Sequence, residues 1–261
     1  MKDIIKYIGL LFLIVFSFYY TDKISTMIIY NSNLMKEIVN NKEKEGIPSE
    51  NAVISGSFIV PGINGKIVNE LDSYYQMKGD YLYQSSKLIF NEVFPEISLE
   101  QNKHLVINRA NQSKKAVSIV VKDNSNIINY SEKEKIAINK LIKYEEFSKN
   151  SYFEQINNDQ DMAKLDVLLH KYNMNTNICF VNDFNRNICK KGSKYLVAAT
   201  YEVDNVSIIG LEIESGDIIL ISDNLSLANY KVLLKKIYYR DLDVVFLSRL
   251  ISEKRNYLEE S

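Results

Sequence analysis

The start of the chain carries the feature that most limits its fold, an apolar segment without a charged residue from Tyr7 to Thr21. As α-helix, these fifteen residues rise about 22 Å, which is short of a hydrocarbon core of about 30 Å. With Lys6 reaching back to the headgroups through its flexible side chain, residues 4–21 span about 27 Å, and helix tilt can absorb the difference. The sequence therefore predicts a transmembrane anchor within residues 1–23.

A cleaved signal peptide and a buried core helix are the two alternatives for this segment. Signal cleavage needs small residues at the cleavage site, and Phe16–Lys23 contains no such pair. Lys2 and Lys6 precede the apolar segment, whereas only Lys23 follows it directly. The positive-inside rule then places the N-terminus in the cytoplasm and the bulk of the chain outside, as a single-pass membrane protein.

Composition argues against nucleic acid as a partner. The 261-residue chain has a formal net charge of −1, and its Lys and Glu residues are interspersed, so no basic surface is expected. Asn, Lys, Ile and Tyr are frequent while Trp is absent, a bias typical of AT-rich bacterial genomes. The residues beyond the anchor are enough for one large or two small domains.

Residues 24–50 are predicted to form a juxtamembrane helix and a linker. Apolar residues recur at helical spacing over residues 24–44, with a break at Asn31, and Gly46–Ser49 ends the helix as a turn. The apolar stripe could pair with a second copy of the chain as a homodimer. Packing on its own domain or lying in the membrane interface is the commoner alternative.

Residues 51–112 are predicted to form a small α+β module. Residues 52–60 alternate as a strand, Pro61–Gly65 follows as a glycine-rich turn with positive φ, and residues 67–77 form an amphipathic helix. No Gly-Lys-Ser or Gly-Lys-Thr follows the glycines, so a phosphate-binding loop is not expected.

Residues 113–261 alternate between strand and helix patterns, which indicates an α/β domain with a mainly parallel sheet. The capping-box sequence Ser131–Glu134 predicts the start of a helix whose apolar face would carry residues 138–142. Further helices are expected near residues 162–172 and 227–237 and at the end of the chain. Short strands are expected at residues 176–182, 194–200, 206–213, 217–222 and 244–247.

Cys179 and Cys189 are the only cysteines. Outside the membrane they could form a disulfide, while two separate buried thiols are the commoner alternative. Metal binding by these two residues is not expected, because no His or further Cys stands at ligand spacing.

Several stretches of the α/β half, in order, resemble the polysaccharide deacetylase family, also called the NodB-homology domain: Val117–Asn124, Leu168–Thr176, Gly216–Asp223 and Leu242–Leu250. Residues 52–111 also resemble a module that precedes such domains in membrane-anchored Bacillota proteins. The clearest pieces of that module are Ile59–Gly65 and Met77–Gly79. The resemblance implies a distorted or incomplete (β/α) barrel, preceded by a transmembrane helix and a small α+β module. Fewer residues are present than a complete barrel of seven or eight units uses.

The family removes N-acetyl groups from sugars with a metal-activated water, held by one Asp and two His while another Asp acts as base. Lys122 stands where the resemblance places the base, which leaves Asp123 as the carboxylate of that turn, and Ser222 replaces a family histidine. The chain has only two histidines, His104 and His170, and no His-x-x-x-His. The family metal, usually zinc, is therefore expected to be lost, and no cofactor is expected.

The leading hypothesis is a catalytically degenerate, membrane-anchored protein that binds cell-wall glycan or an envelope protein. The alternative is an active carbohydrate de-N-acetylase or another hydrolase with a rearranged site, in which Asp123, Asp223 and a histidine converge. A third hypothesis is a structural anchor in which residues 24–44 pair two copies of the chain.

Overall fold

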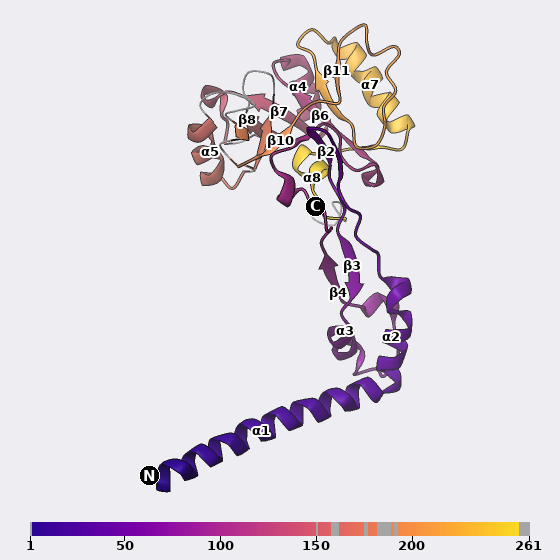
Figure 1. Cartoon of the computed structure of the whole chain (residues 1–261). Coiled ribbons are helices and arrows are strands. Elements are labelled where there is room, and N and C mark those ends of the chain that lie inside the picture. Colours follow the sequence, from indigo (N-terminus) through magenta and orange to yellow (C-terminus); the bar gives the residue numbers. More distant parts are fainter. Residues whose placement is uncertain are drawn as a thin grey trace. The chain divides into compact units, whose positions relative to one another are not determined.

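A computed structural model describes residues 2–149, 151–157, 162–174, 177–181, 189–190 and 193–255 of the chain (Figure 1). The chain forms two compact units, here called the small unit (Met1–Pro48 and Gly65–Val93) and the α/β unit (Ser49–Asn64 and Phe94–Ser261). The residues of the predicted 51–112 module are thus divided between the two units. Asn175, Thr176 and residue 182, which belong to predicted motifs, lie outside the described residues.

The small unit begins with two successive helices. α1 (Lys2–Asn31) contains a stretch from Tyr7 to Asn31 that is long and apolar enough to cross a membrane. Ser32 separates α1 from α2 (Asn33–Glu45), and its Oγ accepts the Met35 N–H at 3.2 Å as the N-cap of α2. The predicted break at Asn31 is therefore a junction between two helices.

An antiparallel ribbon of β3 (Gly65–Val68) and β4 (Phe90–Val93) completes the small unit, with α3 (Glu70–Met77) and η1 (Ser85–Lys87) between its strands. The helix predicted from residue 67 starts later because Asn69 caps α3, accepting the Asp72 N–H at 3.1 Å. The core of the unit joins α1, α2, β3 and α3 through Ile29, Leu34, Met35, Ile38, Val68 and Met77.

The α/β unit is built on a sheet with the strand order β1-β2-β5-β10-β9-β8-β7-β6-β12-β11, and β13 pairs with β6. The strands are β1 (Val53–Ser55), β2 (Phe58–Val60), β5 (Val106–Ile107), β6 (Ala116–Val121), β7 (Ile138–Ile142), β8 (Glu154–Asn157), β9 (Ile178–Phe180), β10 (Tyr195–Val197), β11 (Tyr201–Val203), β12 (Ile218–Ile221) and β13 (Asp243–Val244). The pairs are parallel apart from the β1–β2 hairpin. The helices are α4 (Ser125–Lys133), α5 (Met162–Lys171), α7 (Leu227–Tyr239) and α8 (Leu247–Ile251), with short 3₁₀ turns η2 (Glu100–Asn102), η3 (Gln112–Lys114) and η4 (Tyr144–Glu146).

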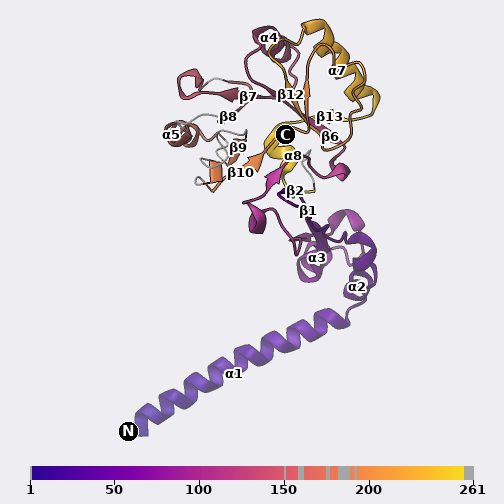
Figure 2. The same cartoon turned by 45° about the horizontal axis from the view of Figure 1, so that its top comes forward.

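This sheet is a distorted (β/α) barrel, as predicted, and α8 lies among its strands (Figure 2). Side chains alternate along each strand. In β6, Val117, Ile119 and Val121 pack with residues of α4 and α7 on the outer face. Ala116 and Val120 instead join α8 in the interior. The short C-terminal helix therefore fills part of the barrel.

Two secondary-structure predictions were wrong. The chain after Ser131 does not start a helix, because α4 already begins at Ser125 with Asn124 as its N-cap and ends at Lys133. Residues 138–142 are the buried strand β7, and a short apolar run buried on both faces has the same periodicity as a buried helix. Residues 206–213 are turns and irregular chain, while the strand of this region is β11.

The glycines with positive φ are not those that the sequence predicted. The predicted strand 52–60 is the β1–β2 hairpin, turned at Gly56, which has φ +58°. Gly62 does not have positive φ, and it is required instead because a Cβ there would collide with the Glu50 carbonyl oxygen. Gly216, directly before β12, has φ +89°. The turn predicted at Pro61–Gly65 is thus a close approach of two backbone segments.

Candidate functional site

The predicted motif residues meet at the C-terminal ends of β6 and β12. These strands are parallel neighbours, with Val121 opposite Ile221, so the residues that follow them lie at the same end of the barrel. A pocket of about 380 Å³ opens there, here called the barrel mouth. Its lining consists of Lys122, Leu141, Phe180, Glu202, Leu220, Ile221, Ser222, Asp223 and Asn224. Asp123 lies on the turn after β6 but does not line this pocket.

Hydrogen bonds tie together the two turns that form the barrel mouth. Asn124 Nδ2 donates to the carbonyl oxygens of Asp223 and Leu225, at 3.3 and 3.0 Å. Ser222 Oγ donates to Asn224 Oδ1 at 2.8 Å. Ser222 therefore serves the turn, at the position where the resemblance places a family histidine.

The barrel mouth carries charges of both signs. Lys122 and the carboxylates of Glu202 and Asp223 line the same pocket. In the described part of the chain, none of the three side chains is in an ion pair. These charges are therefore available to a polar ligand, above a floor formed by Leu141, Phe180 and Leu220.

Both histidines lie at the other end of the barrel. His104 precedes the N-terminal end of β5, and His170 is near the C-terminal end of α5, which leads back to the start of β9. Because β5, β9, β6 and β12 belong to one run of parallel pairs, these positions are opposite the barrel mouth. Both histidine side chains are exposed. Asp123 and Asp223 therefore lie at one end of the sheet, as the hypothesis of a rearranged site requires, but neither histidine lies with them.

The residues of the barrel mouth do not fit the zinc of the family. Zinc is held by neutral imidazoles, thiolates and carboxylates, whereas Lys122 places an ammonium group in this pocket. Among the residues that the structure describes, no three His, Cys, Asp or Glu side chains are grouped to hold a metal ion. The residues of the barrel mouth therefore offer no set of ligands for a metal ion that would activate a water.

Cys179 and Cys189 form a disulfide, with their Cα atoms 5.8 Å apart. The bond joins the middle of β9 to the segment before β10, and both residues are buried with Val106 and Leu196. Of the two alternatives drawn from the sequence, the disulfide is correct and the separate thiols are wrong. Disulfides persist in oxidising compartments such as the outer side of a bacterial membrane.

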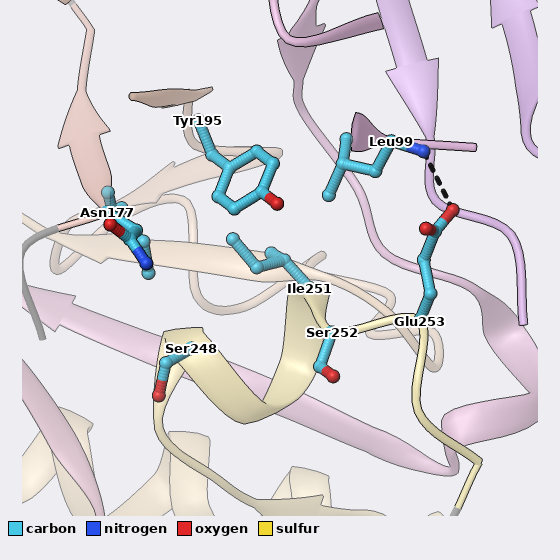
Figure 3. A pocket seen from close by; sticks show the side chains of 8 residues that line it. Leu99, Asn177, Tyr195, Ser248, Ile251, Ser252 and Glu253 are labelled. Carbon is cyan, nitrogen blue, oxygen red and sulfur yellow. Dashed lines mark hydrogen bonds between the residues drawn. The ribbon is translucent and has the colours of Figure 1, made fainter. Parts of the chain in front are cut away.

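A second pocket, of about 210 Å³, lies at the N-terminal ends of β9 and β10 beside α8 (Figure 3). Tyr195 Oη donates to Glu100 Oε2 at 2.7 Å, and burial with this bond raises the pKa of the tyrosine. Glu253 Oε1 accepts the N–H groups of Leu99 and Gly62, at 2.8 and 3.3 Å. Burial raises the pKa of this carboxyl despite those bonds. Sequence patterns do not reveal this pocket, because the partners of Glu253 are backbone groups distant along the chain.

The same C-terminal segment covers a buried lysine. The Lys114 side chain is 3% exposed, and its ammonium donates to the Lys254 carbonyl oxygen. Burial, with a smaller contribution from the nearby Arg255 cation, lowers the pKa of Lys114 to about 8. The folded chain therefore releases this proton at a lower pH than the unfolded chain.

Deprotonation of Lys114 is expected to increase the free energy of unfolding of the α/β unit by about 1 kcal/mol between pH 8 and pH 9, below the pH at which tyrosines of the unfolded chain titrate, because the unfolded state binds more protons there. Urea unfolding of the full chain in detergent, followed by circular dichroism, measures this change. Lys114→Met should remove this increase between pH 8 and pH 9, while Lys115→Met, at the exposed neighbouring lysine, should leave it unchanged. An equal slope in both variants would refute the assignment to Lys114.

Comparison with known proteins identifies the fold but not a close relative. A scan of protein families finds no match, and a search of curated proteins finds none. A CE4 family pseudoenzyme from Bacillus anthracis superposes with a TM-score of 0.57 at 19% identity, over 86% of this chain and 97% of that chain. A mutant of that pseudoenzyme, described as having restored enzymatic activity, superposes with a TM-score of 0.57 at 19% identity, over 85% of this chain and 99% of that chain.

These matches agree with the order of motifs in the sequence and with the parallel barrel. At 19% identity they establish the fold. The chain therefore has the polysaccharide deacetylase fold, the fold of the CE4 family pseudoenzyme.

Proposed function

We propose that this protein is a membrane-anchored pseudoenzyme of the bacterial envelope, which binds cell-wall glycan in the barrel mouth without deacetylating it. The observation that carries the proposal is the replacement of metal ligands at the barrel mouth, with Lys122 in the pocket and both histidines at the opposite end. The mixture of apolar floor and charged rim suits a sugar, which offers both an apolar face and polar groups.

Three features support an extracytoplasmic position for the α/β unit. The helix from Tyr7 to Asn31 is long and apolar enough to span a membrane. Lys2 and Lys6 precede its apolar segment, which favours a cytoplasmic N-terminus. The Cys179–Cys189 disulfide suits an oxidising compartment. Cell-wall glycan would then be the polymer nearest to the barrel mouth.

The second candidate is a hydrolase with a rearranged site. It is favoured by one observation, that Asp123 and Asp223 follow neighbouring parallel strands at the same end of the sheet. The mutant of the Bacillus anthracis pseudoenzyme is described as having restored enzymatic activity. That description supports the view that residues, rather than the fold, decide catalysis in such proteins.

The test measures acetate release and glycan binding together. The full chain in detergent is incubated with N-acetylglucosamine oligomers and peptidoglycan fragments in the presence of zinc, and binding is followed by calorimetry. We expect no acetate above the protein-free control and saturable binding of the oligomers. Acetate release that a chelator abolishes would contradict the proposal and favour the hydrolase.

A matched pair of variants locates the binding site. Lys122→Glu should weaken glycan binding at least about tenfold, or about 1.4 kcal/mol, because it reverses a charge inside the pocket. Lys133→Glu makes the same change at an exposed position at the end of α4 and should alter binding less than twofold. Equal effects of the two variants would exclude the barrel mouth as the glycan site.

A further inference from the structure

The small unit exposes apolar side chains on α3 and on the turn that follows it. Leu71, Tyr75 and Lys78 recur at positions i, i+4 and i+7, so they share one face. Tyr75 is 49% exposed, and in the turn Tyr81 is 79% and Leu82 66% exposed. Lys78 Nζ lies 4.7 Å from the centroid of the Tyr75 ring. These five residues are here called the α3 patch.

The turn of the α3 patch is held in place rather than loose. The N–H groups of Asp80 and Tyr81 donate to the Met77 carbonyl oxygen at 3.0 and 3.2 Å, and Lys87 forms an ion pair with Asp80. Tyr83 packs against the core of the unit. The turn therefore presents Tyr81 and Leu82 outward from a fixed base.

Tyr81 occupies a backbone conformation that does not suit tyrosine. Its φ is +53°, in the left-handed region that favours glycine and asparagine. The ring is largely exposed, so it does not compensate for this conformation by packing within the unit. A residue that is strained in the backbone and exposed in the side chain points to a contact outside the chain.

The core of the small unit lies close to the predicted membrane boundary. Ile29 of α1 and Met77, the last residue of α3, belong to the same buried cluster. From Thr21, the end of the predicted span, to Ile29 is eight residues along α1, or about 12 Å of helix. The headgroup region of one leaflet is about 5–8 Å thick. The core of the small unit would therefore lie close to the membrane surface.

We propose that the α3 patch is a second membrane contact, which inserts Tyr81 and Leu82 into the headgroup region of the leaflet from which α1 emerges. The residue types suit a lipid headgroup region, because tyrosine and leucine favour the membrane interface and Lys78 can reach the lipid phosphates. The inference rests on the proposed membrane anchoring. It would hold α3 and the turn after it against the bilayer, in addition to the anchoring by α1.

Because the chain contains no tryptophan, single substitutions provide site-specific fluorescence reporters. The full chain is reconstituted in vesicles of phosphatidylcholine and phosphatidylglycerol, with or without bromine on the acyl chains as a quencher. Tyr81→Trp reports on the α3 patch, and Leu82→Trp is a second reporter on the same turn. Phe12→Trp reports on the anchor. Tyr239→Trp, at a residue 93% exposed in the α/β unit, is the control in water.

We expect the Tyr81→Trp emission to be shifted to shorter wavelength and quenched by bromine, less than Phe12→Trp and more than Tyr239→Trp. If both turn reporters match Tyr239→Trp while Phe12→Trp is quenched, the anchor stands and this inference is overturned. If the emission is shifted but not quenched, a protein surface such as a second copy covers the patch, which also overturns it. If Phe12→Trp is not quenched, both the anchoring and this inference fail.

Discussion

Substituting alanine for Asn139 is expected to lower the free energy of unfolding of the α/β unit by about 4 kcal/mol. Asn139 is completely buried in β7. Its Nδ2 donates to Ser118 Oγ at 2.7 Å and to the Ile119 carbonyl oxygen at 2.8 Å, and its Oδ1 accepts the Leu247 N–H at 2.8 Å. Alanine would leave these polar groups without this partner in the barrel interior, next to a cavity of the size of the missing amide.

Urea unfolding of the full chain in detergent measures this loss. Asn229→Ala is the matched control, because the Asn229 side chain bonds to Asn205 Oδ1 at the surface, at 2.9 Å, where water can replace it. We expect the control to lose less than about 1 kcal/mol. Losses of equal size would show that Asn139 does not hold α8 to the strands.

Gly216→Ala is expected to destabilise the α/β unit by about 3 kcal/mol or more, through two separate effects. The φ of +89° disfavours alanine. A Cβ would also collide with the Ala110 carbonyl oxygen and approach the Ala110 carbonyl carbon to 2.9 Å. The backbone cannot move away easily, since Gly216 accepts the Ala110 N–H and donates to the Ala116 carbonyl oxygen, each at 2.7 Å.

Two further glycines separate these effects. Gly56 also has positive φ but has open space where a Cβ would lie, so Gly56→Ala should cost about 1 kcal/mol. Gly210 has neither restriction, and Gly210→Ala should stay within about 0.5 kcal/mol of the parent chain. The prediction is that the loss grows in the order Gly210, Gly56, Gly216 under the same urea titration. Another order would contradict the contribution of the Ala110 contact.

Much of the barrel could be predicted because local patterns and tertiary structure agree there. Residues 116–121 form a β-branched run that is buried on both faces, as in parallel sheets. Residues 138–142 are equally buried, but three apolar positions at helical spacing after Ser131 favoured a helix. Strand β8 has no strong pattern and was not predicted. In these short segments, the neighbouring strands decide the structure.

The position of α8 could not be derived from local sequence. Its first N–H groups are capped by Asn139 of β7 and Glu154 of β8, the latter accepting the Ser248 N–H at 2.9 Å. Both partners are distant along the chain, and no side chain of the N-cap residue Phe246 takes part. Capping patterns describe neighbours in sequence, so they do not detect a helix that is capped by strands.

The barrel mouth was predicted as far as its residues follow strands directly. Lys122 and Asp223 lie within two residues of the ends of β6 and β12, and parallel pairing brings such positions together. Glu202 was missed because the strand that carries it, β11, was predicted at residues 206–213.

The division of the chain between its two units limits how the α/β unit could be released from the proposed membrane anchor. The chain passes between the units after Pro48, after Asn64 and after Val93. A protease that cuts any one of these connections leaves the fragments joined, either by the other connections or by the pairing of β2 with β5 and the shared core of α1, α2 and α3. Release of the barrel from the proposed anchor would therefore require more than one cut, so this division of the chain resists shedding.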